Sequence, residues 1–248
     1  TQSFFCAIRT ILLRTSLYAL SIIWFPVITL MLPFPWRIRS ILYRSWCYLS
    51  RFLARYICGV KYNIVGLENT TDLNIKDKKS AVYICNHQSD WETVTLPGIL
   101  TPLCYVLKKE LFYIPFFGWS LKLTQHIGID RSQKLKAMKQ VLRDGNKRIN
   151  QGLSILIFPE GTRTPPFERN DFNKGGAQLA KTAGIPVIPM VVDSGFCWPA
   201  KTHIAYPGTV NIIIGKQIST DNKSTNEIHE QTTKWILDHL AELEKRYL

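Results

Sequence analysis

The chain has 248 residues, 46% of them hydrophobic, which fits one catalytic domain with an appendage and supplies enough apolar side chains for a packed core. Its formal net charge of +13 is unevenly distributed: residues 1–67 contain no acidic residue and eight cations, whereas residues 68–248 carry 23 basic and 18 acidic residues. An N-terminal quarter that is basic, aromatic and apolar favours an anionic lipid surface and argues against a nucleic-acid partner.

The cysteines give no metal or disulfide pattern. No C-x-x-C pair occurs, and no histidine lies at zinc-finger spacing from any of the six cysteines, which are Cys6, Cys47, Cys58, Cys85, Cys104 and Cys197. We therefore expect no metal site, and we expect buried free thiols in a protein of a reducing compartment.

The first apolar segment is long enough to cross a bilayer. Thr15–Trp36 is a run of 22 uncharged residues, and a spanning helix needs about 20. Pro26, Pro33 and Pro35 argue against one straight helix, because proline interrupts the helical hydrogen-bond ladder. A bent segment that enters only one leaflet is therefore favoured over a full span.

Residues 36–56 are predicted to form an amphipathic basic helix. Spacings of seven, seven and four place its arginines on one face, with apolar residues between them: Arg37, Arg44, Arg51 and Arg55. Such a helix suits a lipid headgroup layer. We predict that residues 1–60 form a membrane-associated helical hairpin; the alternative is a hydrophobic helix pair packed on the domain.

Short strands alternate with helices from residue 61 onwards. The predicted strands are Tyr62–Val65, Ala81–Cys85, Leu103–Leu107, Gly128–Asp130, Ser154–Phe158, Val187–Val191 and Val210–Ile214. The predicted helices are Trp91–Leu100, Phe117–Gln125, Gln133–Gln151, Gly175–Ala183 and Thr225–Tyr247. This alternation predicts an α/β catalytic domain over residues 61–248, with a mainly parallel central sheet flanked by helices. Chemistry in such a sheet collects at the carboxyl ends of the strands.

The turn after Cys85 carries a candidate base. His87 follows a buried strand directly, and histidine is the natural base near neutral pH. A carboxylate on its other ring nitrogen would fix the tautomer, and Asp90 and Glu92 compete for that role. The alternative is structural, because Ser89-Asp90-Trp91-Glu92 is also a capping box that would start a helix.

Two further turns carry groups that can bind a phosphorylated substrate. In the turn after Phe158, Gly161 lets the backbone approach a ligand, Glu160 can accept from a hydroxyl, and Arg163 can bind phosphate. The alternative is a surface turn with an internal Glu160–Arg163 pair. After the strand at Gly128, Arg131 is a further phosphate candidate, and its alternative is an ion pair with Asp130.

These motifs together resemble the glycerophospholipid acyltransferase family, whose bacterial lysophosphatidic acid acyltransferases are similar in size. Asn86-His87-Gln88-Ser89 with an acid five residues after His87 resembles the first motif, H-x-x-x-x-D, except that Glu92 replaces the aspartate. Residues 158–163, F-P-E-G-T-R, match the third motif, and Ile129-Asp130-Arg131 matches the core of the second. Residues 187–191, an apolar strand with a proline, match the fourth, which would form only a wall for the acyl chain; from the residues themselves an ordinary core strand is the better interpretation.

The resemblance implies a membrane-bound O-acyltransferase of phospholipid biosynthesis. His87 would be the general base and Glu92 its orienter, with Glu160 and Gly161 binding substrate. The substrate phosphate would contact the motif arginines Arg131 and Arg163, and two lysines near helix starts, Lys108 and Lys174. Asp90 would be a helix cap or a surface residue. The expected product is phosphatidic acid, made from acyl-CoA or acyl-carrier protein and the sn-2 hydroxyl of lysophosphatidic acid.

Several alternatives stay open at this level. The acceptor could be glycerol 3-phosphate or a lyso-amino-lipid, and a thioesterase or a non-catalytic lipid-binding homologue would share the fold. We find no G-x-S-x-G elbow, Walker loop, G-x-G-x-x-G or H-E-x-x-H, so we expect no cofactor beyond the acyl donor. We expect a membrane location with the active site on the cytoplasmic face, at the inner membrane if the source is bacterial.

Overall fold

The structure is a computed structural model that describes residues 2–73, 77, 79–100 and 102–248. Its strands are β1 (Val60–Val65), β2 (Val82–Cys85), β3 (Leu103–Lys108), β4 (Ile127–Ile129), β5 (Ser154–Ile157), β6 (Val187–Val192) and β7 (Gly208–Ile214). Its α-helices are α1 (Gln2–Leu30), α2 (Trp36–Cys58), α3 (Trp91–Ile99), α4 (Phe117–Leu123), α5 (Lys134–Ile149), α6 (Gly175–Ala183) and α7 (Thr225–Glu244). Each predicted strand and helix is present, with ends that differ by a few residues.

The strands form one seven-stranded sheet, within the described residues, in the order β1-β7-β6-β2-β5-β3-β4. Every neighbouring pair is parallel except β6 and β7, so the predicted mainly parallel α/β sheet is confirmed. Since β2, β3, β4, β5 and β6 run in the same direction, their carboxyl ends share one edge of the sheet. The turns that follow these strands therefore meet in space although they are distant in sequence.

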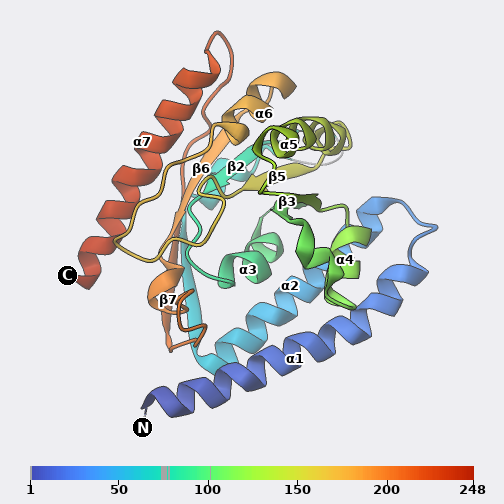
Figure 1. The fold of residues 1–248 in the computed structure, drawn as a ribbon, viewed down its shortest axis with the longest axis vertical. Coiled ribbons are helices and arrows are strands. Elements are labelled where there is room, and N and C mark those ends of the chain that lie inside the picture. Colours follow the sequence, from blue (N-terminus) through green and yellow to red (C-terminus); the bar gives the residue numbers. More distant parts are fainter. Residues whose placement is uncertain (1, 74–76, 78, 101) are drawn as a thin grey trace.

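Helices cover both faces of the sheet (Figure 1). Alternate residues of the strands point to opposite faces: Tyr83 and Cys85 pack in a core with α1, α2, α3 and α4, whereas Val82 and Ile84 pack in a core with α5, α6 and α7. The central strands are buried on both faces, which explains why they read in the sequence as continuous apolar runs.

Helices α1 and α2 form the predicted hairpin along one side of the molecule (Figure 1). Helix α1 continues through Pro26, contrary to the expectation of a break, and the chain turns at residues 31–35, where Pro33 and Pro35 lie. Proline removes only its own bond to the carbonyl four residues earlier, and both Pro26 and Ile22 lie on the exposed side of α1. The helix is long and apolar enough to cross a membrane.

Helix α2 is amphipathic, but its outward face is aromatic as well as basic. It buries Tyr43, Trp46, Cys47, Ser50, Ala54 and Cys58 and exposes Ile41, Tyr48, Phe52 and Tyr56. The Arg51 guanidinium lies 5.0 Å from the ring centroids of both Tyr48 and Tyr62, and that of Arg55 lies 5.9 Å from the ring centroid of Tyr56. The side chain of Arg37, the first arginine of the predicted basic face, is outside the described part of the chain.

The cysteines are buried and unpaired, as predicted. Burial raises the pKa of the Cys47 and Cys104 thiols to about 12, so these groups are neutral core side chains.

Candidate active site

The turn after β2 places His87 against a buried carboxylate. The Nδ1 atom of His87 lies 3.2 Å from Oε2 of Glu92, whose side chain is completely buried. The imidazole also stacks on Phe158, with ring centroids 4.1 Å apart and planes inclined by 17°. Both contacts fix the orientation of the ring and leave Nε2 as the nitrogen that does not face Glu92.

Glu92 is held by the same turn that starts α3. Its carboxylate accepts hydrogen bonds from the backbone N–H groups of Gln88 and Ser89, and Trp91 N donates to the Ser89 hydroxyl at 2.9 Å. The helix-start interpretation and the catalytic interpretation of this sequence are therefore compatible. One carboxylate closes the turn and faces the histidine.

Ser194 gives Glu92 a further partner that no sequence motif indicated. It lies in the short helix η3 (Ser194–Phe196) immediately after β6, and its hydroxyl donates to Oε1 of Glu92. Gly195 N in turn donates to the side-chain oxygen of Gln88 at 3.0 Å. The end of β6 thus supports the histidine turn, because β2 and β6 are parallel neighbours that end at the same edge of the sheet.

Asn86 joins the same two strands through its side chain. Its amide nitrogen donates to the carbonyl oxygen of Val192 at 2.9 Å, and its amide oxygen accepts from Val192 N at 2.8 Å. This paired contact copies a backbone ladder one residue beyond the end of β2, so His87 follows directly on a rigid anchor.

The turn after β5 lies against the histidine turn. His87 N donates to Oε1 of Glu160 at 3.2 Å, and Thr164 N donates to the carbonyl oxygen of His87 at 2.7 Å. Gly161 has a φ of +69°, a left-handed conformation that favours glycine at this corner. The two motifs predicted to share a site are thus hydrogen-bonded to each other.

Glu160 is an unusual carboxyl group. Its Oε2 atom is buried and has no hydrogen-bond partner among the described residues. Burial raises the pKa of Glu160 to about 8, against the effect of backbone N–H groups that lower it. At neutral pH the group is therefore largely protonated and can donate a hydrogen bond as well as accept one.

Arg163 forms an ion pair with Asp90 and not with Glu160, the acid of its own motif. Its Nη1 atom lies 2.6 Å from Oδ1 of Asp90. Asp90 occupies the first position before α3, but its side chain makes no capping bond. Asp90 therefore occupies the cap position at the surface, as expected, but its carboxylate binds Arg163 and does not cap the helix.

Arg131 and Lys108 reach the same region from β4 and β3. The guanidinium of Arg131 donates to the carbonyl oxygen of Gly161, so it does not pair with Asp130. Asp130 binds the ammonium of Lys109 at 2.6 Å, and this contact together with Ser132 holds the pKa of the Asp130 carboxyl well below its usual range. The Arg131 guanidinium is thus directed to the turn that carries Glu160.

Lys174 is not brought to this site. Its ammonium donates to the side-chain oxygen of Asn226 at 2.8 Å, at the start of α7, and it does not line the cavity described below. Proximity to the start of α6 in the sequence suggested a phosphate ligand, but the helix directs the side chain along the opposite face of the sheet. The expectation for Lys174 is corrected on this ground.

A cavity of about 600 Å³ is lined by His87 and by the cations of this region, but not by Glu92, Glu160 or Gly161. Its polar lining comes from the turns and from α1 and includes His87, Asp90, Lys108, Arg131, Arg163 and Arg14. Its apolar lining comes from α1, α2, β3 and α4 and includes Leu17, Tyr43, Trp46, Tyr105, Phe117 and Leu121. The volume is in the usual range for a site that takes a small organic ligand.

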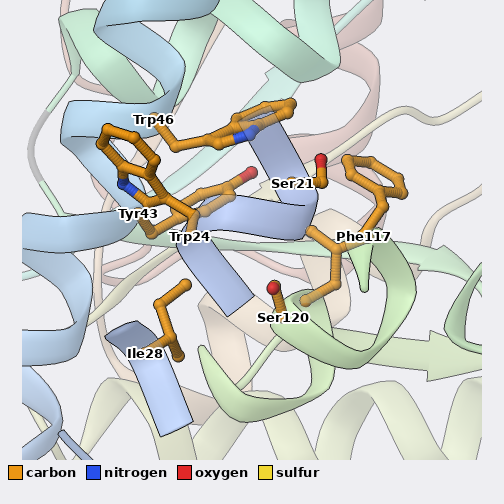
Figure 2. A pocket seen from close by; sticks show the side chains of 8 residues that line it. Ser21, Trp24, Ile28, Tyr43, Trp46, Phe117 and Ser120 are labelled. Carbon is orange, nitrogen blue, oxygen red and sulfur yellow. The ribbon is translucent and has the colours of Figure 1, made fainter. Parts of the chain in front are cut away.

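The apolar part of the cavity runs toward the contact of α1, α2 and α4. Five of its lining residues, Ser21, Tyr43, Trp46, Phe117 and Leu121, also line a second, very small space closed by Trp24, Ile28 and Ser120. Figure 2 shows these side chains converging from the three helices. No residue of the histidine turn lines this second space, so the cavity has a polar end and an apolar end.

Comparison with known proteins gives relatives that cover most of this chain. A family model described as acyltransferase matches residues 62–193. The chain is 38% identical over 243 residues to a 1-acyl-sn-glycerol-3-phosphate acyltransferase of Pseudomonas aeruginosa, covering 96% of this chain and 92% of that protein. It is 33% identical over 185 residues to a protein of the same description from Saccharomyces cerevisiae, covering 73% of this chain and 59% of that one.

A solved structure has the same fold. The crystal structure of the 1-acyl-sn-glycerophosphate (LPA) acyltransferase PlsC from Thermotoga maritima matches with a TM-score of 0.76 at 19% sequence identity, covering 96% of this chain and 98% of that one. The family model spans more than half of the chain, and the Pseudomonas relative is similar over nearly all of it. The chain therefore belongs to the acyltransferase family and is an acyltransferase.

Proposed function

We propose that this chain transfers a fatty acyl group from a thioester donor to the sn-2 hydroxyl of lysophosphatidic acid, giving phosphatidic acid. The observation that carries the proposal is the 3.2 Å contact between His87 and the buried Glu92 at the polar end of a cavity whose other end is apolar. The names of the relatives from Pseudomonas aeruginosa and Saccharomyces cerevisiae support this acceptor.

His87 acts as the general base in this proposal. As Nε2 takes the proton of the acceptor hydroxyl, the hydroxyl oxygen attacks the thioester carbonyl carbon, and Glu92 stabilises the imidazolium that forms. Collapse of the tetrahedral intermediate breaks the carbon–sulfur bond, and the departing thiolate takes the proton back from His87. The donor leaves as a free thiol and His87 returns to its neutral form, so the reaction needs only the two substrates and this chain's own residues.

The acceptor phosphate binds at the polar end of the cavity. Arg131, Arg163 and Lys108 supply positive charge there from three strand ends that meet at one edge of the sheet. Arginine offers a planar fork of donors that matches phosphate oxygens. Glu160 supports this end of the cavity indirectly, because its carboxyl accepts a hydrogen bond from the backbone N–H of His87.

The apolar end of the cavity takes an acyl chain. Its walls are aromatic and aliphatic side chains of β3, α1, α2 and α4, among them Trp46, Phe117 and Leu121. The fourth motif contributes no wall, because Val187–Val192 is buried in the two cores. The donor, acyl-CoA or acyl-carrier protein, delivers its thioester carbonyl to His87 from the mouth of the cavity.

The α1–α2 hairpin holds the enzyme on an anionic membrane surface at its cytoplasmic face. Large apolar side chains of α1 face outward, including Phe5, Ile11 and Leu30, which are between 62% and 71% exposed. Arginines of both helices add attraction to anionic headgroups, worth about 1 kcal/mol for each cation close to the surface. A hairpin within one leaflet leaves both of its ends on the side of the catalytic domain.

A substrate panel tests the proposed function. The full chain, purified in detergent, is given an acyl-CoA or an acyl-carrier protein together with lysophosphatidic acid, glycerol 3-phosphate, a lyso-amino-lipid or no acceptor. Mass spectrometry of the lipids should show phosphatidic acid as the main product. Transfer to another acceptor, or release of free fatty acid whether or not an acceptor is present, would contradict the proposal.

Arg163→Ala separates acceptor recognition from donor recognition. Loss of a hydrogen bond to a charged group costs about 1.5–3 kcal/mol, so the apparent KM for lysophosphatidic acid should rise roughly 10- to 150-fold. The KM for the acyl donor should change much less. Equal increases for both substrates would remove Arg163 from the phosphate site.

A further inference from the structure

Arg14 belongs to α1, the outer helix of the hairpin, yet it lines the same cavity as His87. Its Nη2 atom donates to the carbonyl oxygen of His203 at 3.2 Å and lies 3.6 Å from Oδ2 of Asp90. The hairpin is therefore part of the wall of the polar end of the cavity, as well as the apolar cover of the other end.

Asp90 is the point where the cations of this wall meet. One carboxylate oxygen binds Arg163 at 2.6 Å, while the other lies 3.6 Å from Arg14 and 3.8 Å from Nδ1 of His203. The side chains of Arg14, Asp90 and Arg163 are each 31–46% exposed, so a ligand that enters from the surface can reach all three. A single carboxylate is thus shared between two arginines within three residues of His87.

This arrangement has the charge pattern of an anion site with an internal counterion. A phosphate monoester carries up to two negative charges and three terminal oxygens, so it can engage two arginine forks at once, whereas one carboxylate must divide its oxygens between them. Asp90 also repels an incoming phosphate through its own charge. An acceptor phosphate that binds the arginines therefore competes directly with Asp90.

We propose that Arg14 is a ligand of the acceptor phosphate supplied by the membrane hairpin, and that Asp90 is the counterion that this phosphate displaces. The inference rests on the proposed function for the identity of the acceptor, and it assigns to α1 a role in substrate recognition in addition to its role as an anchor. A lysophospholipid in the membrane–water interface would then contact Arg14 of the hairpin and the arginines at the strand ends at the same time.

The decisive comparison is between Arg14→Ala and Arg9→Ala. Both arginines lie on α1, but Arg9 is exposed and does not line the cavity. Each substitution removes one cation from the hairpin, so any loss of general membrane attraction should be similar for the two. Vesicle flotation with phosphatidylglycerol checks that similarity.

Binding is measured by calorimetry on the full chain in a non-ionic detergent, with lysophosphatidic acid and with the monoacylglycerol that lacks its phosphate. Arg14→Ala should weaken lysophosphatidic acid binding at least about five-fold more than Arg9→Ala does, because it removes a charged hydrogen-bond donor from a partly exposed site. Binding of the monoacylglycerol should respond equally to both substitutions. Inorganic phosphate as a competitor distinguishes a site for any phosphate from one that also needs the acyl chain.

Asp90→Asn should change the affinity for lysophosphatidic acid in the opposite direction. The substitution keeps the shape and removes the competing charge, so lysophosphatidic acid should bind several-fold more tightly, and the gain should shrink when Arg14 is also replaced by alanine. If Arg14→Ala binds like Arg9→Ala, or if Asp90→Asn weakens binding, the inference is wrong. If the variants behave as expected while the wild-type chain does not acylate lysophosphatidic acid, the phosphate site stands and the proposed function fails.

Discussion

Helices α1 and α7 lie on opposite faces of the sheet and use their apolar residues in opposite ways (Figure 1). Helix α7 begins with a capping box formed by Ser224 and Glu227, and it buries an apolar stripe that includes Ile228, Ile236 and Leu240. Helix α1 leaves most of its large apolar side chains on the surface and buries few, among them Leu13 and Leu20.

The difference shows that the two faces of the sheet serve different purposes. Side chains of α5, α6 and α7 fill their face with a solid core, which provides stability. On the other face α1, α2 and α4 enclose a cavity of about 600 Å³ and turn apolar side chains outward, an arrangement that suits a lipid environment. Variants of the two faces should therefore separate activity, stability and membrane binding.

The largest effect is expected from His87→Ala, on the cavity face. Loss of a general base costs about 10²–10⁴-fold in rate, so kcat for acyl transfer should fall by at least about 100-fold. The melting temperature should change little, because the role is chemical. Turnover within a few-fold of wild type would remove His87 from the mechanism.

The matching experiment on the packed face is Ile236→Ala. This side chain is fully buried in the core between α7 and the sheet, and truncation of a buried isoleucine costs about 2–5 kcal/mol of unfolding free energy. A lower melting temperature with unchanged kcat/KM at a temperature well below the transition is expected. A selective loss of kcat in the folded protein would contradict the separation of the two faces.

A smaller effect is expected from Ser194→Ala, which removes one of the hydrogen bonds to the Glu92 carboxylate. Loss of a hydrogen bond to a charged group costs about 1.5–3 kcal/mol at most, and the backbone N–H groups of Gln88 and Ser89 remain. We expect kcat to fall by about 10-fold with the KM of both substrates unchanged, and a shift in the acidic limb of the pH–rate profile. Ser194→Thr, which keeps the hydroxyl, should restore most of the rate.

Glu92 itself gives a graded test beside Ser194. Glu92→Gln should cost orders of magnitude in rate, whereas Glu92→Asp, which restores the usual family residue, should retain partial activity. Asp90→Asn should leave kcat nearly unchanged, since its carboxylate faces arginines and not the imidazole. An inactive Asp90→Asn enzyme beside an active Glu92→Gln enzyme would reverse the assignment of the orienting acid.

Membrane binding gives a direct contrast between α1 and α7. Ile11→Glu places a charge on the exposed apolar side of α1, where Ile11 is 64% exposed, and should weaken binding to phosphatidylglycerol vesicles by about 10-fold. Gln231→Glu adds the same charge to the exposed side of α7 and should change binding far less. Equal losses for the two variants would show that net charge alone governs the interaction.

The smallest effect is a pH dependence at Glu160, which lies where α7 meets the site, near Leu237 and Leu240. Burial raises the pKa of Glu160 from 4.5 to about 8, so between these pH values the folded protein holds a proton that the unfolded chain has released. The stabilising contribution of this proton is complete below about pH 4.5 and is lost as the pH rises toward 8.

Glu160→Gln cannot lose that proton. Its melting temperature relative to the wild type should therefore rise progressively between about pH 5 and pH 8, even if the two proteins differ by a constant amount at low pH. A constant difference across this range would show that Glu160 titrates normally.

Much of the fold could be predicted because its signals are local. The central strands are short apolar runs between turns, and α5 and α7 carry clear helical periodicity, so their order fixed the α/β class. The meeting of His87, Glu160, Arg131 and Lys108 followed from the rule that parallel strands end at one edge. Pro26 was misjudged, because the cost of one missing hydrogen bond depends on which side of the helix it faces.

The remaining features depend on contacts between segments that are distant in the sequence, and no local sequence pattern indicates them. Ser194 reaches Glu92 across 102 positions of sequence, and Arg14 reaches His203 across 189. Lys174 stands one residue before α6, as a phosphate ligand would, but Asn226 of α7 receives its ammonium. In each case the decisive neighbour comes from a distant segment, and only the assembled sheet identifies it.

The side chain of Asn86 has a consequence for how the enzyme fluctuates. It pairs with Val192 on β6, and β2 is the middle strand of the seven, so this contact lies in the most protected part of the sheet. The Asn86 side chain is almost completely buried, so we expect solvent to reach this contact only when the domain unfolds as a whole. The Val192 amide should accordingly exchange its hydrogen with solvent as slowly as global unfolding allows, so that the histidine stays positioned whenever the protein is folded.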